Sequence, residues 1–444
     1  MIFATFQFIN SLLLVLYLIQ IVFKYKKYRV AYIYSPLCWF MLFYCAYFMI
    51  PVLLMKTVEQ NPDLFGHFSF PYEILVECQL IVLLESSLLM IFHGKYIPQP
   101  FKPGFSVLER YKIVNITCLV IVTVFFITSC IAFLGICNAI RTNGYLKAFF
   151  LLDELGDKYR KMFKFQTVRY IAVICVFYIF LKKKNFSVFL LFIPNIMFEI
   201  LAGKRTTAFL YILFVYLVYI KITEKSKIVV IVSVFSVLLV SVLFSRMSSL
   251  SSDSISLDVI IASMLGEFVN TFLTIPYVLN DGLTGCISFT HVLYNLFCPI
   301  LPGFIKTSIM NDPDFFEIGA FLAVHIKKGF GLGSNCISYD LCSFGFQGLL
   351  CLPCIYLLVW KLEEILSKDC NFMIRFYIIY QLRLYMRQGY ESLAIVLYIA
   401  IFYNALFYFL HKKKNYAVVV NKIFPPAKFK CHKILKTFLE SSSC

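Results

Sequence analysis

Apolar stretches long enough to cross a lipid bilayer recur from the first residues of this 444-residue chain to about residue 410. Hydrophobic residues make up 61% of the chain and charged residues only 15%, against about 25% charged in a typical soluble domain. A water-soluble fold is therefore excluded. Since a backbone in hydrocarbon must satisfy its own hydrogen bonds, the sequence predicts one all-α, polytopic membrane domain covering residues 1–444.

We expect about eleven transmembrane helices, because each apolar run is close to the length that spans hydrocarbon. The runs are Ile2–Phe23, Val30–Met55, Ile74–His93, Ile113–Ile136, Tyr170–Leu181, Phe186–Ala202, Thr206–Ile220, Ile228–Ser245, Ser338–Val359, Phe372–Met386 and Ser392–Leu410.

The net charge of +17 has a topological interpretation. If the basic group from Lys24 to Arg29 lies inside the cell, alternate loops hold most of the 41 lysine and arginine residues on the same side, as the positive-inside bias requires. The N-terminus is then external, and residues 411–444 form a basic cytoplasmic tail. The excess of positive charge thus indicates a lipid bilayer as partner rather than nucleic acid.

Cysteine is frequent, with 16 residues, but most cysteines lie in apolar runs, where cysteine acts as a small hydrophobic residue. Cys351 and Cys354 have a metal-ligand spacing, yet no second Cys or His pair completes a site. We therefore expect no metal and no other cofactor. The cytoplasmic loops are also too short for a nucleotide-binding domain, which places the chemistry at the outer face or in the membrane.

Two external segments are long. Residues 137–169 are basic although they lie outside, and they include Arg141 and Arg160. This loop is either an amphipathic helix lying on anionic headgroups or a lid over an anionic lipid-linked substrate. Residues 246–337 are half apolar and have the pattern of re-entrant or interfacial helices; Glu267 within them is expected to face protein or water, either in a structural pair with an arginine or in the site.

A candidate anion site lies between two spans, where Gly203 permits a tight turn before Lys204, Arg205 and Thr206. The next helix presents its N-terminal N–H groups outward beside the two cations, which suits phosphate; simple anchoring of both cations at the interface is the alternative. Arg246 begins the second external segment, and Arg383 and Arg387 lie one helical turn apart on another span. These arginines could converge on one pyrophosphate.

Polar and glycine-rich residues precede the closing helices. His325, Lys327 and Lys328 are candidate polar lining, whereas Gly345 and Gly348 are expected to let helices pack closely. A nucleotide-binding interpretation of the glycines between 329 and 333 fails, because no strand, turn and helix surround them.

In their order along the chain, these motifs resemble those of the O-antigen polymerase (Wzy) family. The resemblance rests on the Gly203–Thr206 turn, on Gly266-Glu267-Phe268, on Gly331-Leu332-Gly333-Ser334 through Asp340 to Phe344-Gly345, and on Arg387 near the last span. The Arg-x10-Gly spacing of some members occurs at none of the external arginines.

The resemblance implies a fold similar to membrane-embedded, lipid-phosphosugar glycosyltransferases in the bacterial inner membrane. It implies that the growing glycan passes from undecaprenyl pyrophosphate to the non-reducing end of a new lipid-linked repeat unit at the periplasmic face, with a chain-length regulator as a further partner.

Fixed arginines and a helix N-terminus would stabilise the leaving pyrophosphate, and Glu267, His325 or Asp340 would serve as the base. The predicted catalytic residues are therefore Arg205, Arg246, Arg387, Glu267, His325 and Asp340. The predicted substrate-binding residues are Lys204, Thr206, Arg141, Arg160, Arg383, Lys327, Lys328 and Ser334.

Two alternatives remain open. An O-antigen ligase would use the same donor but pass the glycan to the lipid A core. A lipid-linked oligosaccharide flippase would need charged residues inside the membrane, and Glu77, Glu85 and Glu199 within apolar runs are the residues that favour it.

Overall fold

The described part of the chain is all-helical, and five of its helices are long and apolar enough to cross a membrane, which indicates a multi-pass membrane protein. The chain divides into two units, Met1–Val396 and Leu397–Cys444, and every helix named below belongs to the first. Of the predicted spans, Thr206–Ile220 and Ile228–Ser245 lie wholly outside the described residues, and Tyr170–Leu181 and Ser392–Leu410 lie largely outside them. The computed structural model describes residues 2–60, 70–99, 112–143, 145–163, 172, 175–176, 179, 190–202, 268–301, 335–367, 372–390, 392–398 and 401.

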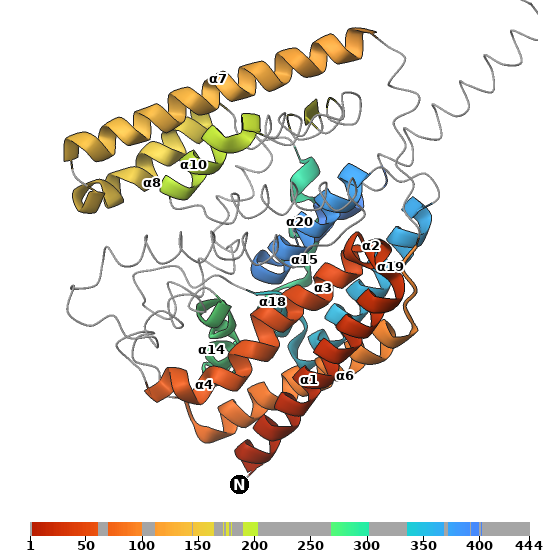
Figure 1. Ribbon diagram of the computed structural model, residues 1–444. Helices are drawn as coiled ribbons and strands as arrows, with labels where there is room; N and C mark the ends of the chain where they lie inside the picture. Colours follow the sequence, from red (N-terminus) through yellow and green to blue (C-terminus); the bar gives the residue numbers. More distant parts are fainter. Residues whose placement is uncertain are drawn as a thin grey trace, which may run out of the picture. The chain divides into compact units, whose positions relative to one another are not determined.

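Helices α1 (Ile2–Tyr28) and α6 (Tyr72–Lys95) lie side by side along much of their length (Figure 1). Their buried polar groups pair across the interface, since Asn10 Nδ2 donates to Gln79 Oε1 at 2.6 Å. Such pairing is needed where no water can satisfy an amide. Both helices match predicted spans and extend past the apolar runs into the basic residues that follow them.

The predicted span Val30–Met55 is interrupted near its start, which corrects the expectation of one continuous helix. A short helix, α2 (Val30–Ile33), ends before Ser35, and α3 (Pro36–Tyr44) begins with proline at its first position. The Ser35 side chain accepts a hydrogen bond from the Leu37 amide and so caps α3. A π-helical turn, Cys45–Met49, then joins α3 to α4 (Ile50–Gln60).

The predicted span Ser338–Val359 is also built from more than one element. Helix α18 (Cys336–Phe344) is followed by a 3₁₀ segment, Gly345–Leu350, and by α19 (Cys351–Ser367). Gly345 has φ of 59°, a conformation that favours glycine, and no atom lies within 4 Å of where its Cβ would be. Its predicted role in close packing is therefore wrong, because it provides the backbone break. Gly348 does allow close packing, since a Cβ there would lie 2.3 Å from the Asp340 carbonyl oxygen.

Helix α20 (Phe372–Gln388) matches the predicted span Phe372–Met386 and packs against α3 and α18. Two short helices, α14 (Thr274–Asn280) and α15 (Phe289–Phe297), lie in the second segment predicted to be external, and α14 contacts α18 and α6.

A separate group of mutually contacting helices consists of α7 (Lys112–Asn143), α8 (Tyr145–Met162) and α10 (Ile193–Leu201). Helix α7 extends well past the predicted span that ended at Ile136. Helix α8 lies in the basic segment 137–169, for which the sequence left open an amphipathic surface helix or a lid over the substrate. Figure 1 shows the three helices as adjacent ribbons.

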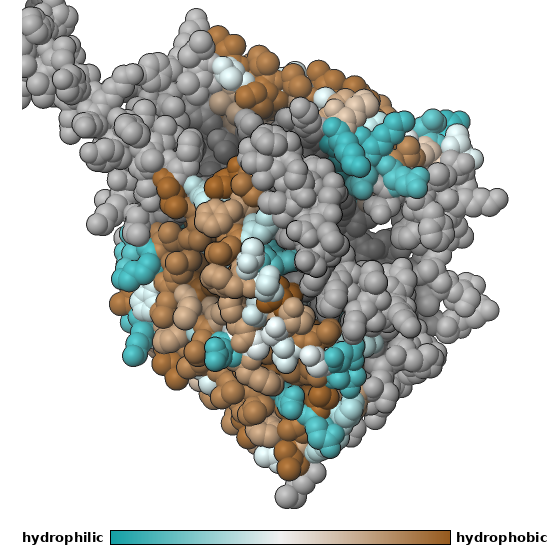
Figure 2. All heavy atoms as spheres, turned by 180° about the vertical axis from the view of Figure 1, so that it is seen from behind, coloured by the Kyte–Doolittle hydropathy of each residue, from teal (hydrophilic) through white to brown (hydrophobic). Residues whose placement is uncertain are grey.

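Apolar side chains cover much of the described surface, which is typical of a surface that contacts lipid rather than water. Figure 2 shows brown, hydrophobic residues over most of the described part of the face that it displays. On α1, Phe8 is 70% exposed and Phe23 is 67% exposed, and on α7 Leu134 is 64% exposed.

Candidate functional site

The candidate site begins at the N-terminus of α18, where a buried polar network joins this helix to the segment before α14. Asn335 caps α18 by accepting a hydrogen bond from the Ser338 amide, and the Ser338 side chain reaches back to the Asn335 amide. The Asn335 amide group also donates to the Thr271 carbonyl and to Thr274 Oγ1, both at 2.7 Å. All of these hydrogen bonds are internal, so they fix the position of the next turn of α18.

Asp340 lies on that next turn and is fully buried. One of its carboxyl oxygens accepts a hydrogen bond from the Tyr390 hydroxyl. Tyr390 is held beside it by Gly389, whose φ of 86° turns the chain at the end of α20 and whose missing side chain would meet the Tyr339 ring at 2.9 Å. Tyr339 in turn accepts a hydrogen bond from the Asn295 side chain of α15. Asp340 is thus held beside the residues that follow α20, and α15 supports the neighbouring Tyr339.

A second buried carboxyl group, that of Glu85 on α6, lies within electrostatic range of Asp340. It accepts a hydrogen bond of 3.4 Å from the Tyr44 hydroxyl of α3. Each carboxyl group keeps one oxygen, Oε1 of Glu85 and Oδ2 of Asp340, that has no hydrogen-bond partner among the described residues. Neither acid forms an ion pair within that part of the chain. The two carboxyl groups are not hydrogen-bonded to each other, and each has an oxygen that could accept a proton from a substrate.

Arg383 and Arg387 lie on α20, which contacts α18, and so the structure brings the predicted acid Asp340 and two predicted arginines onto neighbouring helices. Arg383 is buried, with 7% of its side chain exposed, and Arg387 is half-buried. The guanidinium groups can bind a phosphate with two parallel hydrogen bonds. Of the predicted site residues, the structure thus places Asp340 on α18 and places Arg383 and Arg387 on α20, the helix that α18 contacts.

Arg160, a predicted substrate-binding residue, is instead engaged inside the group formed by α7, α8 and α10. Its side chain is 5% exposed, and its guanidinium pairs with Glu199 at 3.2 Å and with Asp157 at 2.7 Å. It also donates to the Ala202 carbonyl at 3.3 Å. The pair explains Glu199, whose charge is matched by a cation on a neighbouring helix. Arg141, near the end of α7, is exposed.

Most of the other predicted site residues lie outside the described residues, and their assignments stay predictions. Of the motif Gly266-Glu267-Phe268, only Phe268 is described, with its ring centroid 4.8 Å from that of Tyr47. Of the motif that runs from Gly331 to Gly345, the part from Asn335 onward is described. The residues outside are Lys204, Arg205, Thr206, Arg246, Glu267, His325, Lys327, Lys328 and Ser334.

Sequence reasoning missed a second buried polar cluster, centred on Glu363 of α19. Its carboxyl group accepts hydrogen bonds from Ser35 at 2.9 Å and Tyr96 at 2.7 Å, and it pairs with Arg375 of α20 at 3.5 Å. The Lys24 ammonium donates to the Tyr96 carbonyl. Sequence reasoning missed Glu363 because it lies past Val359, the predicted end of the apolar run, in the part of α19 that hydropathy did not predict.

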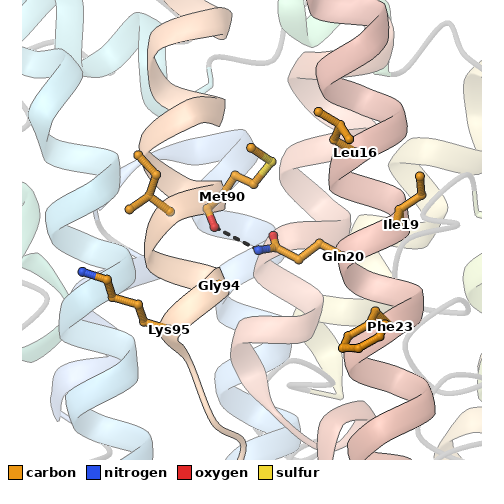
Figure 3. A pocket seen from close by; sticks show the side chains of 8 residues that line it. Leu16, Ile19, Gln20, Phe23, Met90, Gly94 and Lys95 are labelled. Carbon is orange, nitrogen blue, oxygen red and sulfur yellow. Dashed lines mark hydrogen bonds between the residues drawn. The ribbon is translucent and has the colours of Figure 1, made fainter.

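A shallow groove of about 440 Å³ between α1 and α6 is the described cavity that Figure 3 shows. Its lining is almost wholly apolar, and its polar contact is the 3.1 Å hydrogen bond from Gln20 Nε2 to the Met90 carbonyl (Figure 3). Lys95 is the charged residue in its lining. An open apolar groove on exposed helices suits a lipid chain rather than a reacting group.

Within the described residues, no three His, Cys, Asp or Glu side chains lie close enough to hold a metal ion. Comparison with protein family models, with curated proteins and with solved structures finds no match to this chain.

Proposed function

We propose that this chain is a membrane glycosyltransferase of the O-antigen polymerase type. It transfers a growing glycan from undecaprenyl pyrophosphate to the non-reducing end of a new lipid-linked repeat unit. One observation carries the proposal: α18, with Asp340, packs against α20, with Arg383 and Arg387. Such a transfer needs an acid that can take up a proton and cations that can bind pyrophosphate; Asp340 forms no ion pair within the described residues, and a guanidinium suits phosphate.

The reaction breaks the bond between the anomeric carbon and the pyrophosphate oxygen and forms a bond from that carbon to the acceptor oxygen. Negative charge develops on the leaving pyrophosphate, and the arginines of α20, together with Arg205 and Arg246, would stabilise it. The acceptor hydroxyl loses its proton to a base. Asp340 is the described candidate for this base, because its Oδ2 atom is not engaged in a hydrogen bond within the described residues.

The proposal includes a topology of about eleven spans in the bacterial inner membrane, with an external N-terminus and a cytoplasmic C-terminus. Residues 137–169 and 246–337 are then periplasmic, and the lipid carrier approaches the site within the bilayer. The lipid-linked oligosaccharide is the main partner, and a chain-length regulator is the further partner implied by the family resemblance.

The experiment is gel analysis of lipopolysaccharide from a deletion strain that is complemented with Arg205→Ala, Arg246→Ala or Arg387→Ala. We expect each variant to lose about 10²–10³-fold in rate, because it lacks one group that stabilises the transition state. A core band with one repeat unit would then replace the ladder. Lys361→Ala is the matched control, because Lys361 is exposed on α19 and pairs only with the neighbouring Glu364 among the described residues. Full ladders from all three well-expressed arginine variants would contradict the site.

The buried pair of Glu85 and Asp340 favours a second candidate, a proton-coupled flippase for the lipid-linked oligosaccharide. The same gels separate the candidates. Loss of a flippase leaves no repeat unit on the core and keeps the lipid-linked units beyond reach of an external glycosidase. Loss of a ligase also leaves the core bare, but long polymer then accumulates on the lipid carrier.

A further inference from the structure

A turn between α14 and α15 docks against the C-terminal end of α18. The Gly285 amide donates to the Leu341 carbonyl and the Ile287 amide donates to the Cys342 carbonyl, both at 2.9 Å. The Leu341 carbonyl also accepts a hydrogen bond from the Gly345 amide at the C-cap of α18, so the turn adds a second donor there and a donor to the Cys342 carbonyl near the helix end. Gly285 has φ of 73°, which lets the turn approach in this orientation.

This docking places two cysteines together. The two backbone hydrogen bonds lie on either side of Cys286, and the thiols of Cys286 and Cys342 are themselves hydrogen-bonded. Thiols that interact across backbones joined in this way are near neighbours, which is the first requirement of a disulfide. Cys286 is exposed, whereas Cys342 is fully buried. An external reagent therefore reaches Cys286 first.

The hydrogen bond from Cys342 lowers the pKa of the Cys286 thiol to about 7, against the opposing effect of partial burial. A large share of Cys286 is consequently thiolate near neutral pH, and the thiolate is the form that attacks a disulfide. The exposed member of the pair is thus also the reactive member.

We propose that Cys286 and Cys342 form a reversible disulfide that fastens the turn before α15 to the end of α18. The Cys286 thiolate attacks the disulfide of an external thiol–disulfide oxidoreductase and forms a mixed disulfide, releasing one thiol of that partner. The Cys342 thiol then loses its proton, and its sulfur attacks the Cys286 sulfur and releases the second thiol of the partner, which takes up that proton. The two cysteines lose two electrons and two protons in total, and the partner gains them as a dithiol.

The bond has a consequence for the site, because Cys342 lies two residues after Asp340 and the turn leads into α15, which holds Tyr339 through Asn295. Oxidation would fix the distance between α15 and α18. The proposal relies on the external location of residues 246–337, as the proposed function does, but it does not depend on the reaction.

The test uses the full-length protein in membranes from cells quenched with acid and treated with N-ethylmaleimide in denaturant. We expect mass spectrometry of the unreduced digest to show a Cys286–Cys342 linked peptide, which disappears after reduction and in Cys286→Ser. The linked peptide persists in Cys298→Ser, the matched control on the same segment. Complete alkylation of both Cys286 and Cys342 in the wild-type protein would overturn the proposal.

A membrane-impermeant maleimide applied to intact cells distinguishes the two ways in which the proposal can fail. If Cys286 is free and is labelled from outside, the disulfide is wrong and the proposed external site stands. If Cys286 is free and is protected from the impermeant reagent until the cells are lysed, the segment is not external and the proposed function fails with it.

Discussion

Two buried carboxyl groups near opposite ends of the Cys336–Glu364 span have very different surroundings. Glu363 accepts two hydrogen bonds and pairs with Arg375, so both of its oxygens have partners. Asp340 accepts one hydrogen bond from Tyr390, and its second oxygen has none within the described residues.

This difference in hydrogen bonding distinguishes an acid that stabilises the fold from an acid that is a candidate for the reaction. A buried acid with a cation and full hydrogen bonding contributes to holding helices together, and losing its partner is costly. A buried acid that keeps an oxygen without a partner weakens the fold locally, so its presence needs another reason. Asp340 and Glu85 belong to the second kind, and Glu363 belongs to the first.

The largest effect on stability is expected from Arg375→Ala. The substitution leaves Glu363 as a buried charge without its cation, which costs about 3–5 kcal/mol in the free energy of unfolding. Unfolding by SDS in mixed micelles measures it. Lys361→Ala, which removes an exposed pair on the same helix, is expected to leave the midpoint unchanged. Equal midpoints for wild type and Arg375→Ala would show that the Glu363 cluster does not hold α19 to α20.

A smaller loss is expected from Gly348→Ala. The new Cβ would lie 2.3 Å from the Asp340 carbonyl oxygen, which belongs to the backbone and cannot rotate away. Forcing atoms into such a packed position costs about 1–3 kcal/mol. Leu350→Ala on the same 3₁₀ segment is the control, because that side chain is 61% exposed. If Gly348→Ala unfolds like wild type and also keeps full ladder formation, the position of Asp340 is not set by this contact.

The smallest effect on stability is expected from Asp340→Asn, at under about 1 kcal/mol, because the amide keeps an acceptor for Tyr390 and removes the ionisable group. Ladder formation should nevertheless fall by about 10²-fold or more if Asp340 is the base. Glu73→Gln, at an exposed position of α6, serves as the control. Wild-type ladders from a stable Asp340→Asn protein would show that Asp340 is not the base. Asp340 and Glu363 would then not differ in function.

Within the described residues, the sequence predicted where the membrane-length helices lie, because hydrophobicity is a local property that accumulates over about 20 residues. All five described membrane-length helices coincide with predicted apolar runs. The interruptions at Ser35 and Gly345 were missed, since each depends on a single cap or backbone angle inside an apolar run. Hydropathy averaged over a window cannot detect such positions.

The candidate site was predictable only in part. Asp340, Arg383 and Arg387 were identifiable as polar residues in or beside apolar helices, but nothing local indicated that Glu85, some 250 residues earlier, lies near Asp340. The same limit applies to Arg160 and Glu199, which are 39 positions apart and form a salt bridge across two helices. Pairings of this kind depend on tertiary packing, which a pattern of residue types does not specify.

The π-helical turn Cys45–Met49 fixes how many residues the chain can have between α3 and α4. A turn that accommodates one additional residue rotates everything after it by about 100° relative to a regular α-helix, since each residue advances the helix by that angle. Val52 and Met55 are buried in α4 with this rotation in place. Deleting one residue between 45 and 49 would restore a regular helix and turn both side chains out toward lipid, so natural length variation is expected to avoid this stretch.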